Sequence, residues 1–112
     1  MSSNDPLKRL QDILDQIARI EEYVAGMSIS AYAADRRTQD AVERCFERIC
    51  EAARKIGDGL DTKYPDVGFP NLRKFGSVLR HDYDDVDSDI VWEFTQRRIH
   101  LLKAAARAEL GR

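Results

Sequence analysis

Cysteine is scarce in this sequence, whose 112 residues include only Cys45 and Cys50. The two lie five residues apart inside one expected helix, which is not the Cys-x-x-Cys spacing of zinc or redox sites. So few cysteines also argue against the disulfide framework of small secreted domains. We therefore expect both to be small core residues of a cytoplasmic protein.

Long apolar stretches and a surplus of positive charge are also missing. No segment approaches the ~20 apolar residues of a membrane-spanning helix. The first six residues have neither the basic start nor the apolar run of a signal peptide, so we expect a cytoplasmic protein without membrane contact. The 18 Lys and Arg residues against 20 Asp and Glu residues give a formal net charge of −2. Any contact with nucleic acid must therefore come from a local patch.

Prolines and glycines are few, three and six, and no stretch alternates apolar with polar residues as a strand does. Apolar residues recur instead at helical spacing, and the length suits one domain. We expect residues 1–112 to form a single all-α domain, an antiparallel bundle of four main helices with one short helix. The expected helices begin at Pro6, Ser28, Asp35 or Thr38, Pro70 and Ser88, and end near Gly26, Ala34, Gly57, Tyr83 and Leu110. Residues 62–69 form the longest loop.

The stretch Val78-Leu79-Arg80-His81-Asp82-Tyr83 ends the helix that is expected to open at Pro70. At about 100° per residue, one apolar stripe contains Leu72, Phe75, Leu79 and Tyr83. His81 falls on the opposite face, near Lys74 and Ser77. A histidine there is suited to acid–base chemistry near neutral pH. The alternative is a solvated helix face that happens to carry a histidine.

A metal site built from His81 and the aspartates that follow it is disfavoured, because neighbouring helical residues point in different directions. The sequence has no glycine-rich phosphate loop either, and we expect no cofactor. The remaining chemistry is acid–base catalysis by His81 on a phosphodiester. Metal-free RNA cleavage needs a group that titrates near neutrality and a cation that holds the phosphate.

Three cations lie near His81 in the sequence, Arg73, Lys74 and Arg80, and Ser77 offers a further phosphate contact. On a regular helix Arg80 projects about 100° away from His81. Arg80 therefore serves its own site only if the helix ends there, or else it serves the site of a neighbouring subunit. A site shared by two chains predicts a homodimer.

The order of elements resembles the HepT-like toxins of the HEPN superfamily over nearly the whole chain. The matching stretches are Asp12-Ile13-Leu14 through Ile20-Glu21-Glu22-Tyr23, Ala41-Val42-Glu43-Arg44, Ile49-Cys50-Glu51-Ala52-Ala53, Val78-Leu79-Arg80-His81-Asp82-Tyr83, and Val86-Asp87 with Ile90-Val91-Trp92. The resemblance implies an all-α homodimer that acts as a metal-independent endoribonuclease. It also implies a partner, a minimal nucleotidyltransferase antitoxin, which attaches AMP to the tyrosine of the motif.

The family motif is Arg, four to six residues, His, any residue, Tyr. By resemblance His81 and Tyr83 carry over directly, and Glu51 corresponds to a polar residue that the superfamily places on the preceding long helix. Where the family usually has Arg-Asn ahead of the histidine, this chain has Gly76-Ser77. Three interpretations stay open: an active RNA-cleaving toxin, a weak or inactive helical module that pairs with the nucleotidyltransferase, and a plain helical dimer without a site.

Overall fold

The structure, a computed structural model, describes residues 5–81 and 86–112, and the side chains of all of these except Arg80 and His81. Within these ranges the secondary structure is entirely helical. The helices are α1 (Pro6–Val24), α2 (Ile29–Ala33), α3 (Arg36–Ile56), α4 (Phe69–His81), α5 (Ser88–Glu93) and α6 (Ile99–Glu109), with a 3₁₀ turn η1 (Pro65–Val67) and a π-helical segment η3 (Phe94–Arg98). The prediction of an all-α fold with four main helices and one short helix is confirmed.

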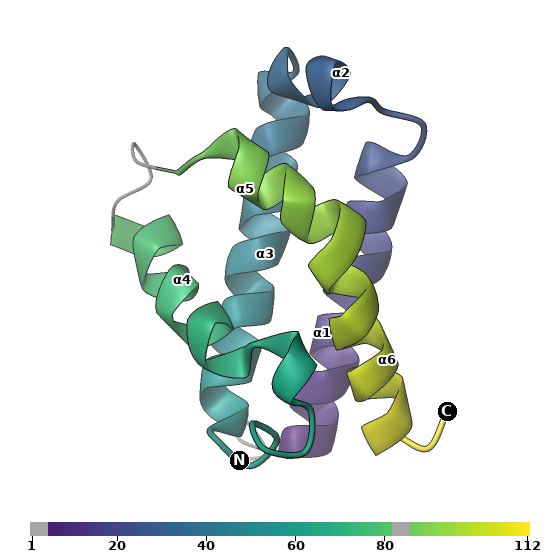
Figure 1. The fold of residues 1–112 in the computed structure, drawn as a ribbon, viewed down its shortest axis with the longest axis vertical. Coiled ribbons are helices and arrows are strands. Elements are labelled where there is room, and N and C mark those ends of the chain that lie inside the picture. The colour runs from purple at the N-terminus through teal and green to yellow at the C-terminus, as the bar shows by residue number, and fades with distance from the viewer. Residues whose placement is uncertain (1–4, 82–85) are drawn as a thin grey trace.

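The helices form an antiparallel bundle with α3 in its middle (Figure 1). α3 packs against both α1 and α4, and α6 runs alongside α1. The two parts of the last helix have different neighbours. α5 contacts the short helix α2, and α6 contacts α1. Over the described ranges, no helix is long and apolar enough to cross a membrane.

Side chains cap the helix starts where the sequence predicts them. The carboxylate of Asp5 accepts a hydrogen bond from the Leu7 amide at 3.0 Å, and that of Asp35 accepts one from the Thr38 amide at 3.0 Å. These bonds satisfy amides that have no partner within the helix. α4 begins at Phe69, one residue before the predicted Pro70, because proline fits the first turn as well as the first position. The predicted loop before it also contains the turn η1.

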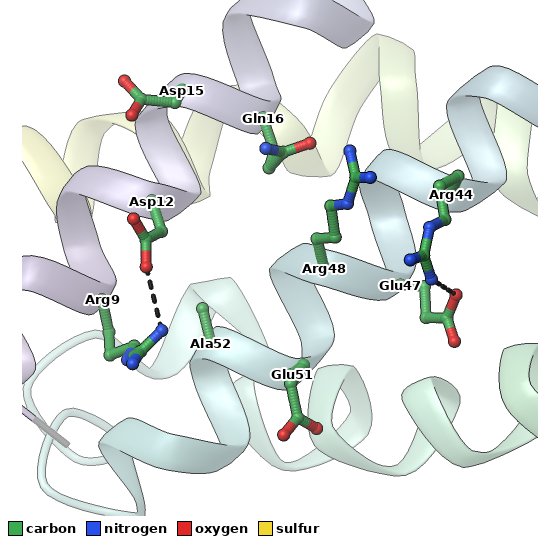
Figure 2. Close-up of a pocket in the computed structure, with 9 residues that line it drawn as sticks. All are labelled: Arg9, Asp12, Asp15, Gln16, Arg44, Glu47, Arg48, Glu51 and Ala52. Atoms are coloured by element: carbon green, nitrogen blue, oxygen red, sulfur yellow. Dashed lines mark hydrogen bonds and ion pairs between the residues drawn. The ribbon is translucent and has the colours of Figure 1, made fainter. Parts of the chain in front are cut away.

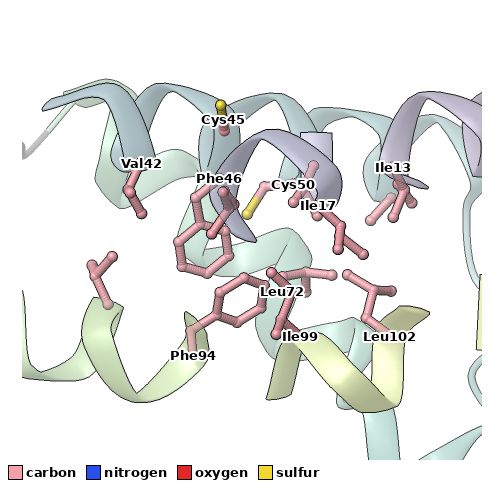
Figure 3. Packing of buried hydrophobic residues seen from close by; sticks show 14 of the residues in the cluster. Ile13, Ile17, Val42, Cys45, Phe46, Cys50, Leu72, Phe94, Ile99 and Leu102 are labelled. Atoms are coloured by element: carbon pink, nitrogen blue, oxygen red, sulfur yellow. The ribbon is translucent and has the colours of Figure 1, made fainter. Parts of the chain in front are cut away.

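One continuous hydrophobic core receives side chains from all of these helices (Figure 3). The predicted stripes of α1 and α3 are buried, with Ile13, Ile17, Val42 and Ile49 fully inaccessible. At the centre Phe46 stacks on Phe94 with ring centroids 3.9 Å apart. Burial of this apolar surface is the main stabilising term of such a bundle.

Both cysteines are buried, as predicted for small core residues. Burial raises the pKa of the Cys45 thiol. A thiol with a raised pKa carries little thiolate at neutral pH, and the thiolate is the form that binds metals and attacks other groups. Cys45 therefore acts as a packing residue.

The last helix departs from the predicted regular helix over Phe94–Arg98, where it adopts π-helical geometry. The hydroxyl of the buried Thr95 donates a 2.6 Å hydrogen bond to the carbonyl of Trp92. A threonine hydroxyl can donate to a carbonyl of its own helix, and here it satisfies the Trp92 carbonyl next to the wider π-helical turn.

Candidate functional site

α4 carries the histidine motif and packs antiparallel on α3. Near its start, Nη1 of Arg73 donates to the carbonyl of Gly57, the residue that follows α3. Two residues further along α4, the ring centroids of Phe75 and Phe46 lie 5.2 Å apart. The carboxyl end of α4 therefore lies beside the amino-terminal half of α3.

Up to residue 79, α4 has the buried apolar face and the exposed polar face that the sequence predicts. Leu72 and Leu79 are buried, and Phe75 is half-buried against the core. Lys74 and Ser77, which were predicted to share a face with His81, are both exposed. The structure therefore places these two predicted RNA contacts on the solvent side of the helix.

The motif residues themselves lie at the edge of what the structure describes. The backbone of Arg80 and His81 belongs to the last turn of α4. The side chains of these two residues, and the whole of Tyr83, lie outside the described residues. The roles of His81 and Arg80 in catalysis and of Tyr83 in modification therefore stay predictions.

Arg73, a predicted RNA contact, is bound within its own chain. Its Nη1 and Nη2 donate to the two carboxylate oxygens of Asp61 at 2.9 and 2.7 Å, in addition to the 3.0 Å bond to Gly57. These bonds hold the pKa of the Asp61 carboxyl below its usual range and raise the pKa of Arg73. They tie the start of α4 to the end of α3. Arg73 could contact phosphate only by leaving this pairing.

The substitution Arg73→Ala is expected to lower the free energy of unfolding by about 1–2 kcal/mol, because it removes hydrogen bonds to a carboxylate and a carbonyl. Lys74→Ala is the matched control; it removes the neighbouring exposed cation and should change stability by less than about 0.5 kcal/mol. Urea denaturation of the three proteins at neutral pH measures both effects. Equal stability of the Arg73→Ala protein and the parent would contradict the structural role of Arg73.

The difference in stability between the parent and the Arg73→Ala protein should depend on pH. The ordinary pKa of an aspartate is 3.8, and the folded value of Asp61 lies below it. Its ion pair therefore stabilises the fold fully above this value and loses that contribution as the pH falls through the folded pKa. The stability difference between the parent and Arg73→Ala should shrink in acid.

Glu51, the predicted polar partner on α3, lines a cleft of about 370 Å³ between α1 and α3 (Figure 2). Three arginines and four carboxylates line this cleft. Most of the charged side chains are held in ion pairs between residues three apart on one helix, namely Arg9–Asp12, Arg44–Glu47 and Arg54–Glu51. The cleft has no surplus of positive charge and is poorly suited to bind a phosphate.

Glu51 and α4 do not share a pocket among the described residues. Glu51 lines the cleft between α1 and α3, and no residue of α4 lines that cleft. α4 instead contacts α3 through the rings of Phe75 and Phe46.

Glu43 is a half-buried acidic residue of α3 that the sequence analysis did not select. Burial, and then the nearby Asp40, raise the pKa of the Glu43 carboxyl. Burial, and then the same two carboxylates, also raise the pKa of the buried Tyr32 of α2. A carboxyl group with a raised pKa can exchange a proton closer to neutral pH. Sequence periodicity could not find Glu43, because its burial depends on the packing of other elements against α3.

No group of three or more His, Cys, Asp or Glu side chains within residues 5–79 and 86–112 is arranged to hold a metal ion. The discounted metal site around His81 and the following aspartates lies outside the described side chains. It therefore stays an alternative that only a metal-dependence measurement can decide.

Comparison with known proteins matches residues 13–109 to the model of a family described as Ribonuclease HepT-like. A protein of Thermococcus cleftensis named Probable ribonuclease HepT is 30% identical over 94 residues, which are 84% of this chain and 86% of that protein. A Methanocaldococcus jannaschii protein named Putative RNase MJ1216 is 32% identical over 103 residues, 92% of this chain and 85% of its own length. No solved structure matches.

Proposed function

This chain belongs to the HepT-like ribonuclease family, and from that premise we propose that it is the RNA-cleaving toxin of a toxin–antitoxin pair. In this proposal it is a cytoplasmic, metal-independent endoribonuclease. A minimal nucleotidyltransferase is its antitoxin, which neutralises it by attaching AMP to Tyr83.

The observation that carries the proposal is the solvent-facing side of α4, which leads from Lys74 and Ser77 to the position of His81 in the last helical turn. His81 acts as the general acid or base that moves the proton of the 2′-hydroxyl or protonates the leaving oxygen. Lys74 holds the phosphate as its charge develops, and Arg80 adds a second cation. Lys74 is preferred over Arg73, because it makes no ion pair with any other described residue whereas Arg73 is bound to Asp61.

The site is completed by a second copy of the chain. One histidine and one lysine that pairs with no described residue make a weak phosphate site, and Glu51 lines a cleft that contains no described residue of α4. In a two-fold dimer whose α4 helices pack together, each interface contains the cations of both chains. Their charge also offsets the acidic run that follows His81.

The proposal is tested by separating the protein by size at micromolar concentration and assaying each fraction for RNA cleavage in EDTA. Cleavage should follow the dimer peak, and the 5′ fragments should end in a 2′,3′-cyclic phosphate. Cleavage that follows a monomer peak would contradict the shared site. Cleavage that needs an added divalent ion would favour the metal site that we discounted.

Gly76 favours a second candidate function, a weak or inactive helical module that pairs with the nucleotidyltransferase. The family usually has an arginine at this point of the motif, and here Gly76 is buried in the helix interface. This position of α4 therefore offers no cation to a substrate. No cleavage of any RNA by a protein that still binds the nucleotidyltransferase would favour this function.

A further inference from the structure

A second hollow of about 350 Å³ lies between α4 and the last helix, away from the α1–α3 cleft. Three phenylalanines line it. Phe46 and Phe94 are buried and stack with centroids 3.9 Å apart, and the half-buried Phe75, whose centroid lies 5.2 Å from that of Phe46, is the most exposed of the three (Figure 3 shows the first two). Leu72 and Val67 complete the apolar part. A small hollow with an aromatic lining suits a flat ring system.

The rim of this hollow is polar. Asn71 of α4, Glu93 of α5 and Arg98 of η3 all line it and are all exposed. Glu93 and Arg98 form no ion pair with each other or with any other described residue. Their hydrogen-bonding groups are therefore available to a ligand.

Gly68 lies beside Arg98 at this rim. A Cβ atom at position 68 would lie 2.8 Å from Nη1 of Arg98, and the φ of Gly68 is +74°, where other residues are strained. The backbone conformation favours glycine at this position, and the guanidinium of Arg98 lies close to the backbone that precedes α4.

We propose that this hollow, the α4–η3 groove, holds one unpaired base of the RNA substrate, and guanine in preference to the other bases. The inference rests on the proposed action on RNA. Proteins read single-stranded RNA by placing unstacked bases on aromatic side chains and bonding their edges. Guanine presents an N–H donor edge to the Glu93 carboxylate and the O6 and N7 acceptors to the Arg98 guanidinium.

The position of the groove on α4 agrees with this role. Asn71 at the rim and residue 81 are ten residues apart on one helix, roughly 15 Å. The bound base therefore belongs to a nucleotide beside the cleaved bond and not to the bond itself. Lys74, one turn from Asn71, lies between them and can contact the connecting backbone.

A second copy of the chain fits the groove less well. Among the groove residues, Ile90 is the one large apolar side chain that is strongly exposed, at 58%. A stable interface of two proteins buries about 800 Å² on each partner and has an apolar centre. The groove instead combines a small apolar part with the three exposed polar side chains of its rim.

The test measures binding of 5′-labelled hexamers that carry 2′-O-methyl groups and so cannot be cleaved through the 2′-hydroxyl. The host is an all-U hexamer, and the probes have one central G, A or C. The G hexamer should bind more tightly than the all-U hexamer by roughly 5- to 150-fold, the range for one good base contact. Arg98→Gln and Glu93→Gln should each abolish this preference. Arg97→Gln is the matched control: it removes an exposed arginine that does not line the groove, so the preference should remain.

Three outcomes overturn the groove assignment. The first is equal binding of all hexamers, and the second is a guanine preference that survives both Arg98→Gln and Glu93→Gln. The third is conversion of a dimer to a monomer by Ile90→Lys, which would mean that a second copy covers the groove. Cleavage of unmodified RNA, measured in parallel, separates this inference from the proposed function. Cleavage of unmodified RNA without a base preference would contradict the groove assignment and leave the proposed ribonuclease function in place. A guanine preference that depends on Arg98, in a protein that cleaves no RNA, would contradict the proposed ribonuclease function and support the groove as an RNA-binding site.

Discussion

His81→Ala is expected to lower the rate of RNA cleavage by about 10²–10⁴-fold, the usual loss when a general acid or base is removed. The reason is that imidazole is the side chain whose ordinary pKa lies near neutrality, so it can both take and give a proton at the reacting oxygen. The helical content and the unfolding midpoint should stay close to those of the parent. The measurement is single-turnover cleavage of a labelled RNA in EDTA.

The chain offers a matched control for this substitution. His100 is the second histidine and is exposed on α6. His100→Ala should leave the cleavage rate unchanged. Full activity of the His81→Ala protein would remove the acid–base assignment, and equal losses in the two variants would mean that the effect is not specific to the motif.

Tyr83→Phe is expected to give a toxin that the nucleotidyltransferase partner cannot modify and that resists neutralisation. In the parent, the phenol oxygen of Tyr83 would attack the α-phosphorus of ATP, form the AMP ester and release pyrophosphate. The added phosphate brings negative charge and bulk close to His81 in the sequence. It should repel RNA and compete for the same cations.

Modification is measured by incubation with the partner and Mg-ATP, followed by mapping of AMP by mass spectrometry. Tyr23→Phe is the matched control, because Tyr23 is an exposed tyrosine at the far end of α1. It should still be modified and neutralised. If the partner neutralises Tyr83→Phe as well as the parent, protection comes from simple binding and the modification has no regulatory role.

The sequence was sufficient to predict the helices because helix formation depends on features that are local. Asp5, Asp35 and Asp87 sit at helix starts, and a stripe such as Val42, Cys45, Phe46 and Ile49 repeats at helical spacing. Both kinds of signal span only a few residues. They gave the element order, the buried faces and the exposed positions of Lys74 and Ser77.

Features that depend on packing between elements could not be predicted. Arg73 looked like a free cation until the turn after α3 brought Asp61 to its guanidinium. Glu51 resembled a site residue by its place in a motif, but in the fold it lines the α1–α3 cleft, which contains no described residue of α4. The α4–η3 groove combines residues from three separate segments of the chain, so no single stretch of sequence contains its pattern.

The π-helical segment has a consequence for how the length of the last helix can vary among relatives. A π turn amounts to one extra residue in an α-helix. Deletion of one residue between Phe94 and Arg98 that restores a regular helix would leave the following residues in phase with Val91, because the π turn absorbs the roughly 100° of rotation that one residue adds. Ile99 and Leu102, both buried against the core, would then stay buried. A single-residue deletion within the regular helix α6 has no such compensation and would turn the residues after it by about 100°. We therefore expect the last helix to tolerate loss of one residue within Phe94–Arg98 better than within α6, and the exposed turn around Asp58 and Gly59 to change in length as well.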